Sequence, residues 1–68
     1  MKLKTLLDQI GGGNKIHLQN WGKNERKEFM NHLRFERLTD EELNAPVLIL
    51  EGVAYNEVYI SLDTTEED

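Results

Sequence analysis

Side chains that could act in nucleophilic or acid–base catalysis are few in this 68-residue chain. It has no cysteine, a single serine, Ser61, and two histidines, His17 and His32. A serine nucleophile needs a base within hydrogen-bond reach and a third group that orients the base. Ser61 falls at a polar position of an alternating segment, where hydroxyl groups are ordinary. We therefore expect no enzyme activity, no catalytic residue and no cofactor.

A metal or phosphate site is the next chemistry to consider. Glu28 and His32 are four residues apart, a spacing that places two ligands on one side of a helix, and His17 could join them from a strand. The same spacing is ordinary on a solvated helix face, so we predict no metal site. The glycine-rich residues 11–15 follow a helix and precede a strand, which is the reverse of the order that a phosphate-binding loop requires.

Charge is divided sharply along the chain. Residues 1–37 hold all 8 Lys and Arg with 4 acidic residues, a net charge of +4, whereas residues 38–68 hold 9 acidic residues and no basic one. The whole chain carries −5. Such a division of charge affects how a protein associates with its partners more than how it folds. Either the two halves attract each other within one molecule, or they present two electrostatic faces to a partner.

The N-terminal half predicts a helix, a strand and a second helix. Apolar residues recur at helical spacing from Leu3 to Ile10, and Gly11 is placed to end that helix. Alternation predicts a strand over Lys15–Gln19. A second helix, rich in basic residues, is expected over residues 23–34, with Phe29, Met30 and Leu33 as its apolar stripe.

The C-terminal half predicts a short helix and then a β-hairpin. Thr39 and Glu42 have the spacing of a capping box, which marks the start of a helix. Residues 47–50 are apolar throughout, which is typical of a strand covered on both faces, and residues 58–62 alternate. A turn at residues 55–56 closes the hairpin.

The hairpin register and the core are predicted together. A bulge at Glu51-Gly52 would place Leu50 opposite Ile60 and Leu48 opposite Leu62. The expected core consists of Leu3, Leu6, Leu7, Ile10, Leu48, Leu50, Val58, Ile60 and Leu62, with Phe29 and Leu33 beside the sheet. We thus predict one small α+β domain over residues 1–62 and an acidic, disordered tail over residues 63–68.

The predicted order of helix, strand, helix, short helix, strand and strand resembles the topology of winged-helix DNA-binding domains. The resemblance covers nearly the whole chain, makes residues 51–57 the wing, and rests on topology without a sequence motif. In that family the helix before the hairpin reads the major groove, whereas this position holds Asp40, Glu41 and Glu42, which a phosphate backbone repels. The basic side chains of the expected second helix could separately lie along a nucleic-acid backbone, and we keep a winged-helix-like nucleic-acid-binding protein as the alternative function.

The preferred interpretation is a small acidic protein-binding module without catalytic activity. Size and acidity resemble accessory or inhibitor proteins of phages and mobile elements that act on a host protein. Exposed aromatic and charged side chains are the expected contact residues, namely Trp21, Arg26, Lys27, Asp40, Glu41, Tyr55 and Tyr59. A homodimer in which the basic second helix of one copy faces the acidic third helix and hairpin of the other is one arrangement that the charge division allows, and neutralisation of the two halves within one monomer is the competing one.

Location follows from composition alone. No apolar run has the length needed to span a bilayer, so no membrane partner is expected. The absence of cysteine fits a reducing compartment, and the expected location is the cytoplasm.

Overall fold

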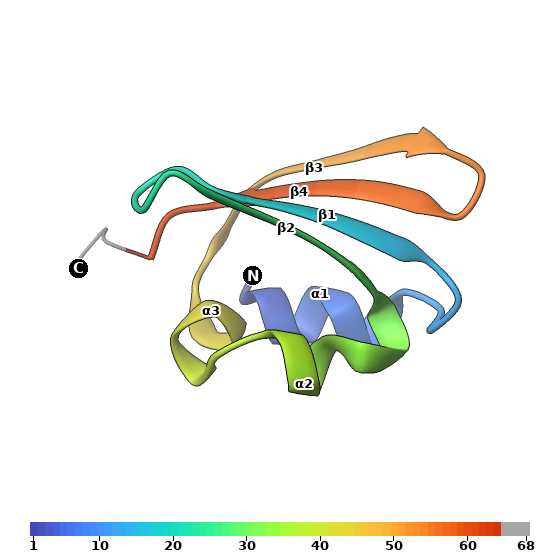
Figure 1. Ribbon diagram of the computed structural model, residues 1–68, viewed down its shortest axis with the longest axis horizontal. Coiled ribbons are helices and arrows are strands. Elements are labelled where there is room, and N and C mark those ends of the chain that lie inside the picture. Colours follow the sequence, from blue (N-terminus) through green and yellow to red (C-terminus); the bar gives the residue numbers. More distant parts are fainter. Residues whose placement is uncertain (65–68) are drawn as a thin grey trace.

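The computed structural model describes residues 1–64, which form a helical layer on one face of a four-stranded sheet (Figure 1). The elements are α1 (Leu3–Gln9), β1 (Lys15–Asn20), β2 (Glu25–Met30), the 3-10 turn η1 (Asn31–Leu33), α2 (Arg34–Arg37), α3 (Asp40–Asn44), β3 (Val47–Ala54) and β4 (Glu57–Leu62). Within residues 1–64, no helix lies on the opposite face of the sheet (Figure 1). The α+β class is confirmed, but the predicted order of elements is not.

The sheet consists of two hairpins joined through their inner strands. Its order is β2-β1-β4-β3, in which β1 pairs with β4 in parallel and the two hairpins, β1–β2 and β3–β4, are antiparallel. The outer strands, β2 and β3, are therefore the two edges of the sheet. Among the helices of residues 1–64, none has the length and apolar character that crossing a bilayer requires.

The core lies between the helical layer and the inner strands. Ile16 and Leu18 of β1 point inward beside Ile60 and Leu62 of β4, because alternate residues of a strand share a face. The buried cluster consists of Leu3, Leu6, Leu7, Ile16, Leu18, Phe29, Leu38, Leu43, Ala45, Ile60 and Leu62. The prediction that the first helix and the hairpin share one core is confirmed for β4.

The predicted helix over residues 23–34 is wrong, because half of this segment is strand β2. Asn20 Oδ1 accepts a hydrogen bond from the Lys23 N–H (3.4 Å), and Asn24 adopts a left-handed conformation (φ 53°), which Asn tolerates well. This turn returns the chain alongside β1. Hydrogen bonds of the antiparallel ladder between β1 and β2 take the place of the helical hydrogen bonds that these residues would otherwise make. The winged-helix resemblance, which needs a helix here, is not confirmed.

The hairpin prediction is confirmed in its turn and in one pair of its register. Tyr55 and Asn56 form the turn, with Asn56 at φ 62°, and Leu50 lies opposite Ile60. The predicted bulge position is wrong. The register shifts between Val47 and Ile49 and again between Gly52 and Ala54, so that Leu62 lies opposite Val47 and not opposite Leu48.

Two predicted core residues lie elsewhere. Leu48 and Leu50 are 49% and 50% exposed, because β3 is an outer strand and not one covered on both faces. Residues 65–68 of the predicted tail lie outside the described residues. Thr64 is within them, where its Oγ1 accepts a hydrogen bond from the Asn20 side chain (2.8 Å).

Candidate functional site

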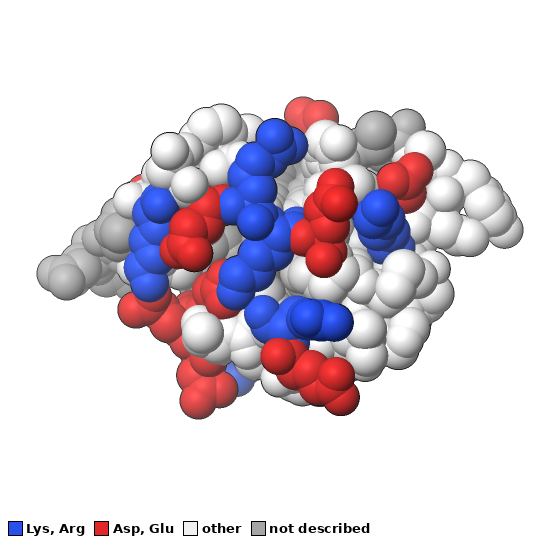
Figure 2. All heavy atoms as spheres, viewed as in Figure 1, with Lys and Arg blue, Asp and Glu red and all other residues white. Residues whose placement is uncertain are grey.

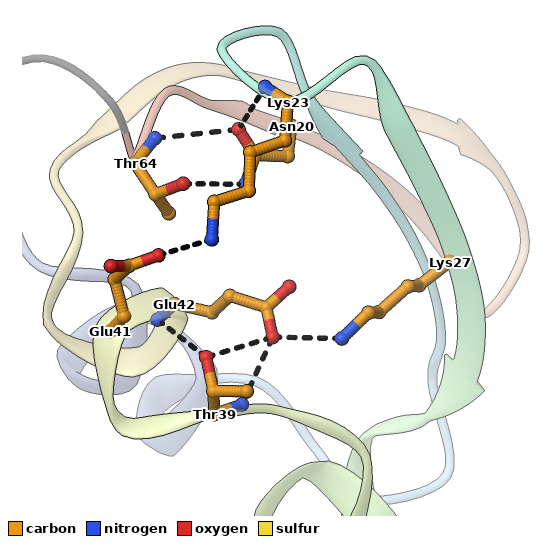
Figure 3. Close-up of polar contacts among 7 residues, drawn as sticks. All are labelled: Asn20, Lys23, Lys27, Thr39, Glu41, Glu42 and Thr64. Carbon is orange, nitrogen blue, oxygen red and sulfur yellow. Dashed lines mark hydrogen bonds and ion pairs between the residues drawn. The ribbon is translucent and has the colours of Figure 1, made fainter.

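A polar cleft between the β1–β2 turn and α3 brings the two oppositely charged parts of the chain together (Figure 3). The predicted capping box at α3 is confirmed: the Glu42 N–H donates to Thr39 Oγ1 (3.2 Å), and the Thr39 N–H donates to Glu42 Oε1 (2.9 Å). Lys27 Nζ reaches the same Glu42 oxygen from β2, at 2.8 Å. One buried carboxylate thus caps a helix and holds it to the sheet.

The electrostatics of Glu42 favour its charged form. Burial alone would raise the pKa of this carboxyl group. The hydrogen bond from Lys27, those from Thr39 and the positive charge of Lys27 outweigh burial and hold the pKa of Glu42 below its ordinary value. Such a low pKa is the signature of a carboxylate that is already paired, and it gives Glu42 no capacity to act as a general acid near neutral pH.

A second contact across the cleft joins the same two parts of the chain at the surface. Lys23 Nζ donates to Glu41 Oε1 at 2.6 Å, which lowers the pKa of Glu41 and raises that of Lys23. Figure 2 shows Lys and Arg side chains forming a band across this face, with acidic side chains on both sides of it. The basic and acidic parts of the chain therefore pair within one molecule.

The open face of the sheet centres on His17. Its Nδ1 lies 3.0 Å from Glu28 Oε1 and its Nε2 lies 3.0 Å from Glu57 Oε1, while the Tyr59 ring lies beside it with a centroid separation of 4.4 Å. Because carboxylates only accept hydrogen bonds, each of these contacts is a hydrogen bond when the ring nitrogen in it carries a proton. Both ring nitrogens thus face a carboxylate oxygen from a neighbouring strand.

A shallow groove of about 540 Å³ runs over this face. It is lined by His17, Leu18, Gln19, Arg26, Lys27, Glu28, Tyr59, Ile60 and Ser61. The residues considered above as possible metal ligands do not converge in it. Glu28 contacts His17, whereas His32 lies beyond β2 and its Nδ1 contacts the Gly12 carbonyl (3.0 Å). Within residues 1–64, no group of three His, Asp or Glu side chains could hold a metal ion.

The predicted contact residues do not form one surface. Trp21 lies at the end of the sheet where its N–H bonds the Leu62 carbonyl, and Tyr55 lies at the opposite end, before β4 begins. The length of a six-residue strand, roughly 20 Å, separates these two ends. Among the others, Arg26 and Tyr59 line the open-face groove, Lys27 and Glu41 are engaged in the polar cleft, and Asp40 begins α3.

The two edges of the sheet differ in a way that the sequence analysis missed. Edge strand β2 carries charge at four consecutive positions, Glu25 to Glu28, which is how proteins protect an edge against unwanted pairing. Edge strand β3 has one charged residue, Glu51, and three consecutive apolar residues, Leu48, Ile49 and Leu50, that are each about half exposed. Only knowledge of the strand order reveals this difference, because an apolar run is equally typical of a central strand.

The β3 edge is free along most of its length. At its start, the Val47 N–H donates to the Met1 carbonyl (2.9 Å), and Lys2 pairs with Pro46. Beyond Val47, no backbone hydrogen bond from another segment of residues 1–64 reaches the outer side of β3. We call the outer side of Leu48–Ala54 the β3 edge. It offers backbone donors and acceptors beside exposed apolar side chains.

Comparison with known proteins found no family model, no curated protein and no solved structure that matches this chain.

Proposed function

We propose that this chain is a small, non-catalytic protein-binding module that binds its partner by strand addition at the β3 edge. The observation that carries the proposal is the contrast between the two edges of the sheet. Charged residues occupy β2, whereas β3 presents half-exposed Leu48, Ile49 and Leu50. An apolar, unprotected edge of this kind is a template for pairing with another strand.

Strand addition suits the geometry of this edge. An added strand forms main-chain hydrogen bonds with the free donors and acceptors, which supply affinity, while its alternate side chains meet the two faces and supply specificity. Leu50 points toward the helical face and Ile49 toward the open face, since they lie opposite Ile60 and Ser61. Tyr55, which is 92% exposed in the adjoining turn, extends the contact surface beyond the strand.

The alternative function is nucleic-acid binding, which needs Lys and Arg side chains that can contact phosphate groups. Most of the basic side chains expected to do so already form ion pairs within the chain. Lys23, Lys27 and Arg34 pair with Glu41, Glu42 and Asp8, and the whole chain carries −5. Titration with duplex and single-stranded DNA at low and high salt discriminates the two functions. Saturable binding that weakens steeply with salt would favour the nucleic-acid function over ours.

The direct test of the proposal compares proteins retained from a lysate of the native host by three immobilised forms. These are the unmodified chain, Ile49→Lys on the β3 edge, and Phe35→Lys, a matched change at an exposed apolar residue of α2. We expect at least one protein to be retained by the unmodified chain and by Phe35→Lys and to be lost with Ile49→Lys. Equal retention by all three forms would contradict the proposal.

A further inference from the structure

We infer that the segment added at the β3 edge is a cationic, apolar strand of a partner protein, antiparallel to β3, with a lysine or arginine opposite Glu51. Large apolar residues of the same segment lie opposite Leu50 and Gly52. The inference rests on the proposed function, because it names the chemistry of the strand that the edge binds. The alternation of β3 would suit any added strand, so the choice depends on the charge, the backbone and the open space of the edge.

The outward backbone groups of the edge belong to Leu50 and Gly52. The Leu62 carbonyl points toward β1, because it accepts a hydrogen bond from the N–H of the residue that follows β1 (2.9 Å). Backbone groups of successive residues in a strand point to alternate sides, so those of Tyr59 point toward β3. Glu51 lies opposite Tyr59, and its own backbone groups therefore point inward, to β4. Those of Leu50 and Gly52, on either side of Glu51, are left for an added strand.

Glu51 occupies the position at which a side chain of the added strand comes close. An antiparallel strand would exchange backbone hydrogen bonds with Leu50 and Gly52, so its residue opposite Glu51 belongs to a non-hydrogen-bonded pair. In such a pair the Cα atoms lie about 4.5 Å apart, against about 5.5 Å in a hydrogen-bonded pair. The side chain opposite Glu51 therefore lies directly beside its carboxylate, on the open face of the sheet.

The charge around the edge selects a basic residue for that position. Within residues 1–64, Glu51 forms no ion pair. Hairpin residues 47–62 contain a second acidic residue, Glu57, and no lysine or arginine. Opposite charges that face each other across a strand pair attract, and like charges repel. The net charge of −5 adds a long-range attraction for a cationic segment, so both effects favour a basic partner strand.

Gly52 selects a large apolar residue on the helical face. Apart from its chain neighbours, no atom of residues 1–64 lies within 4 Å of the position that a side-chain Cβ would take at Gly52. Val58, directly opposite on β4, is only partly buried. An aromatic or long aliphatic side chain of the added strand would fill this space and cover Val58, as aromatic residues do beside edge glycines. On the same face, half-exposed Leu50 calls for an aliphatic neighbour.

The N-terminal residues of the chain indicate the direction of the added strand. Lys2 pairs with Pro46 in the antiparallel sense just before β3 begins, on the outer side of the sheet. A segment that continues this outer row along the β3 edge runs the same way, antiparallel to β3. From its N-terminus, its pattern is large apolar, basic, aliphatic and apolar. These four residues lie opposite Gly52, Glu51, Leu50 and Ile49 in turn.

NMR titration of the nitrogen-15-labelled chain with synthetic peptides tests the inference. The probe is SGTFKVITGS, in which phenylalanine, lysine, valine and isoleucine supply the pattern. Its matched control, SGTFEVITGS, has glutamate in place of the lysine. We expect the probe to shift the amide signals of Leu50 and Gly52 and the control to bind about threefold to tenfold more weakly. Added salt should narrow this difference, because the pair is exposed.

Charge reversal on the chain tests the register. Glu51→Lys should invert the preference, so that the glutamate peptide binds more tightly than the lysine peptide. Glu36→Lys, at an exposed residue of α2, changes the net charge equally and should keep the preference for lysine. The inference is overturned if the two peptides bind the unmodified chain equally or not at all, if Glu51→Lys leaves their order unchanged, or if the shifted amides lie outside β3.

The lysate experiment separates this inference from the proposed function. Release of the retained protein by the lysine peptide, and not by the glutamate peptide, would support both. If neither peptide binds while a host protein is still retained and is lost with Ile49→Lys, the inference fails and the proposed function stands. If no protein is retained through the β3 edge either, both fail.

Discussion

At the scale of single residues, Glu42 and Asn31 hold the helical layer in place. Glu42 caps α3 and pairs with Lys27 of β2. Asn31 is fully buried, and its Nδ2 donates to the carbonyls of Leu7 (2.9 Å) and Ile10 (2.8 Å), which closes the end of α1. The capping partner of Glu42 is visible in the sequence because it is local. Lys27 and Asn31 are not, because their partners lie 15 or more residues away.

Removing the cap of α3 should destabilise the fold. Thr39→Ala deletes the hydroxyl that accepts from the Glu42 N–H, and it should lower the free energy of unfolding by about 0.5–2 kcal/mol. Thr39→Ser keeps the hydroxyl and should remain within about 0.5 kcal/mol of the unmodified chain. Urea denaturation measures both. Equal stability of the Ala and Ser variants would show that the capping bond contributes nothing.

Protonation of Glu42 should remove its contribution to stability. Because its pKa in the folded chain lies below the ordinary value of 4.5, the unfolded chain binds the proton more readily. The contribution is therefore complete above about pH 4.5 and is lost as the pH falls through the lower, folded pKa. Glu42→Gln should lower the free energy of unfolding by roughly 1–2 kcal/mol at pH 7.

The same comparison made along a pH series isolates this carboxylate. The difference in unfolding free energy between the unmodified chain and Glu42→Gln should shrink as the pH falls below about 4.5. Glu36→Gln, a matched change at an exposed residue of α2, is the control, and we expect it to change the free energy of unfolding by less than about 0.5 kcal/mol at pH 7. A Glu42→Gln difference that stays constant down to pH 3 would contradict the assignment.

At the scale of elements, β2 and β3 show which parts of the fold the sequence could predict. The first helix, the strand at Lys15, the capped α3 and the hairpin turn follow from local spacing, and all four are present. Residues 25–30 contain good helix formers, so their local pattern favours a helix, and only pairing with β1 makes them a strand. Whether the apolar β3 is central or outermost depends on the order of the strands, which no local pattern encodes.

The outer position of β3 predicts a contrast between two residues that face each other. Ile60 is 1% exposed and Leu50 is 50% exposed, although they are directly opposite across the β3–β4 pair. Ile60→Ala should lower the free energy of unfolding by about 2–5 kcal/mol, and Leu50→Ala by about 1 kcal/mol in the monomer. Urea denaturation at low micromolar protein concentration measures the loss of unfolding free energy in both variants. Comparable losses would place Leu50 in the core after all.

At the scale of the whole molecule, the divided charge of the sequence becomes internal pairing. Lys23–Glu41 and Lys27–Glu42 join the basic and acidic parts across the polar cleft (Figure 3). Arg34–Asp8 ties α2 to α1. Of the two interpretations that the charge division left open, this pairing supports attraction within one molecule. The apolar β3 edge, on which the proposed function rests, is a feature that charge patterning along the sequence could not reveal.

The central claim is that β3, and not β2, is the edge that accepts another strand. Amide hydrogen exchange of the unmodified chain, followed residue by residue with and without the protein that the unmodified chain and Phe35→Lys retain from the lysate, tests it most directly. We predict that outward-facing amides of Ile49–Gly52 exchange several-fold more slowly in the presence of that protein, while those of β2 exchange at the same rate in both samples. Unchanged exchange of β3, or protection that develops on β2 instead, would contradict the claim.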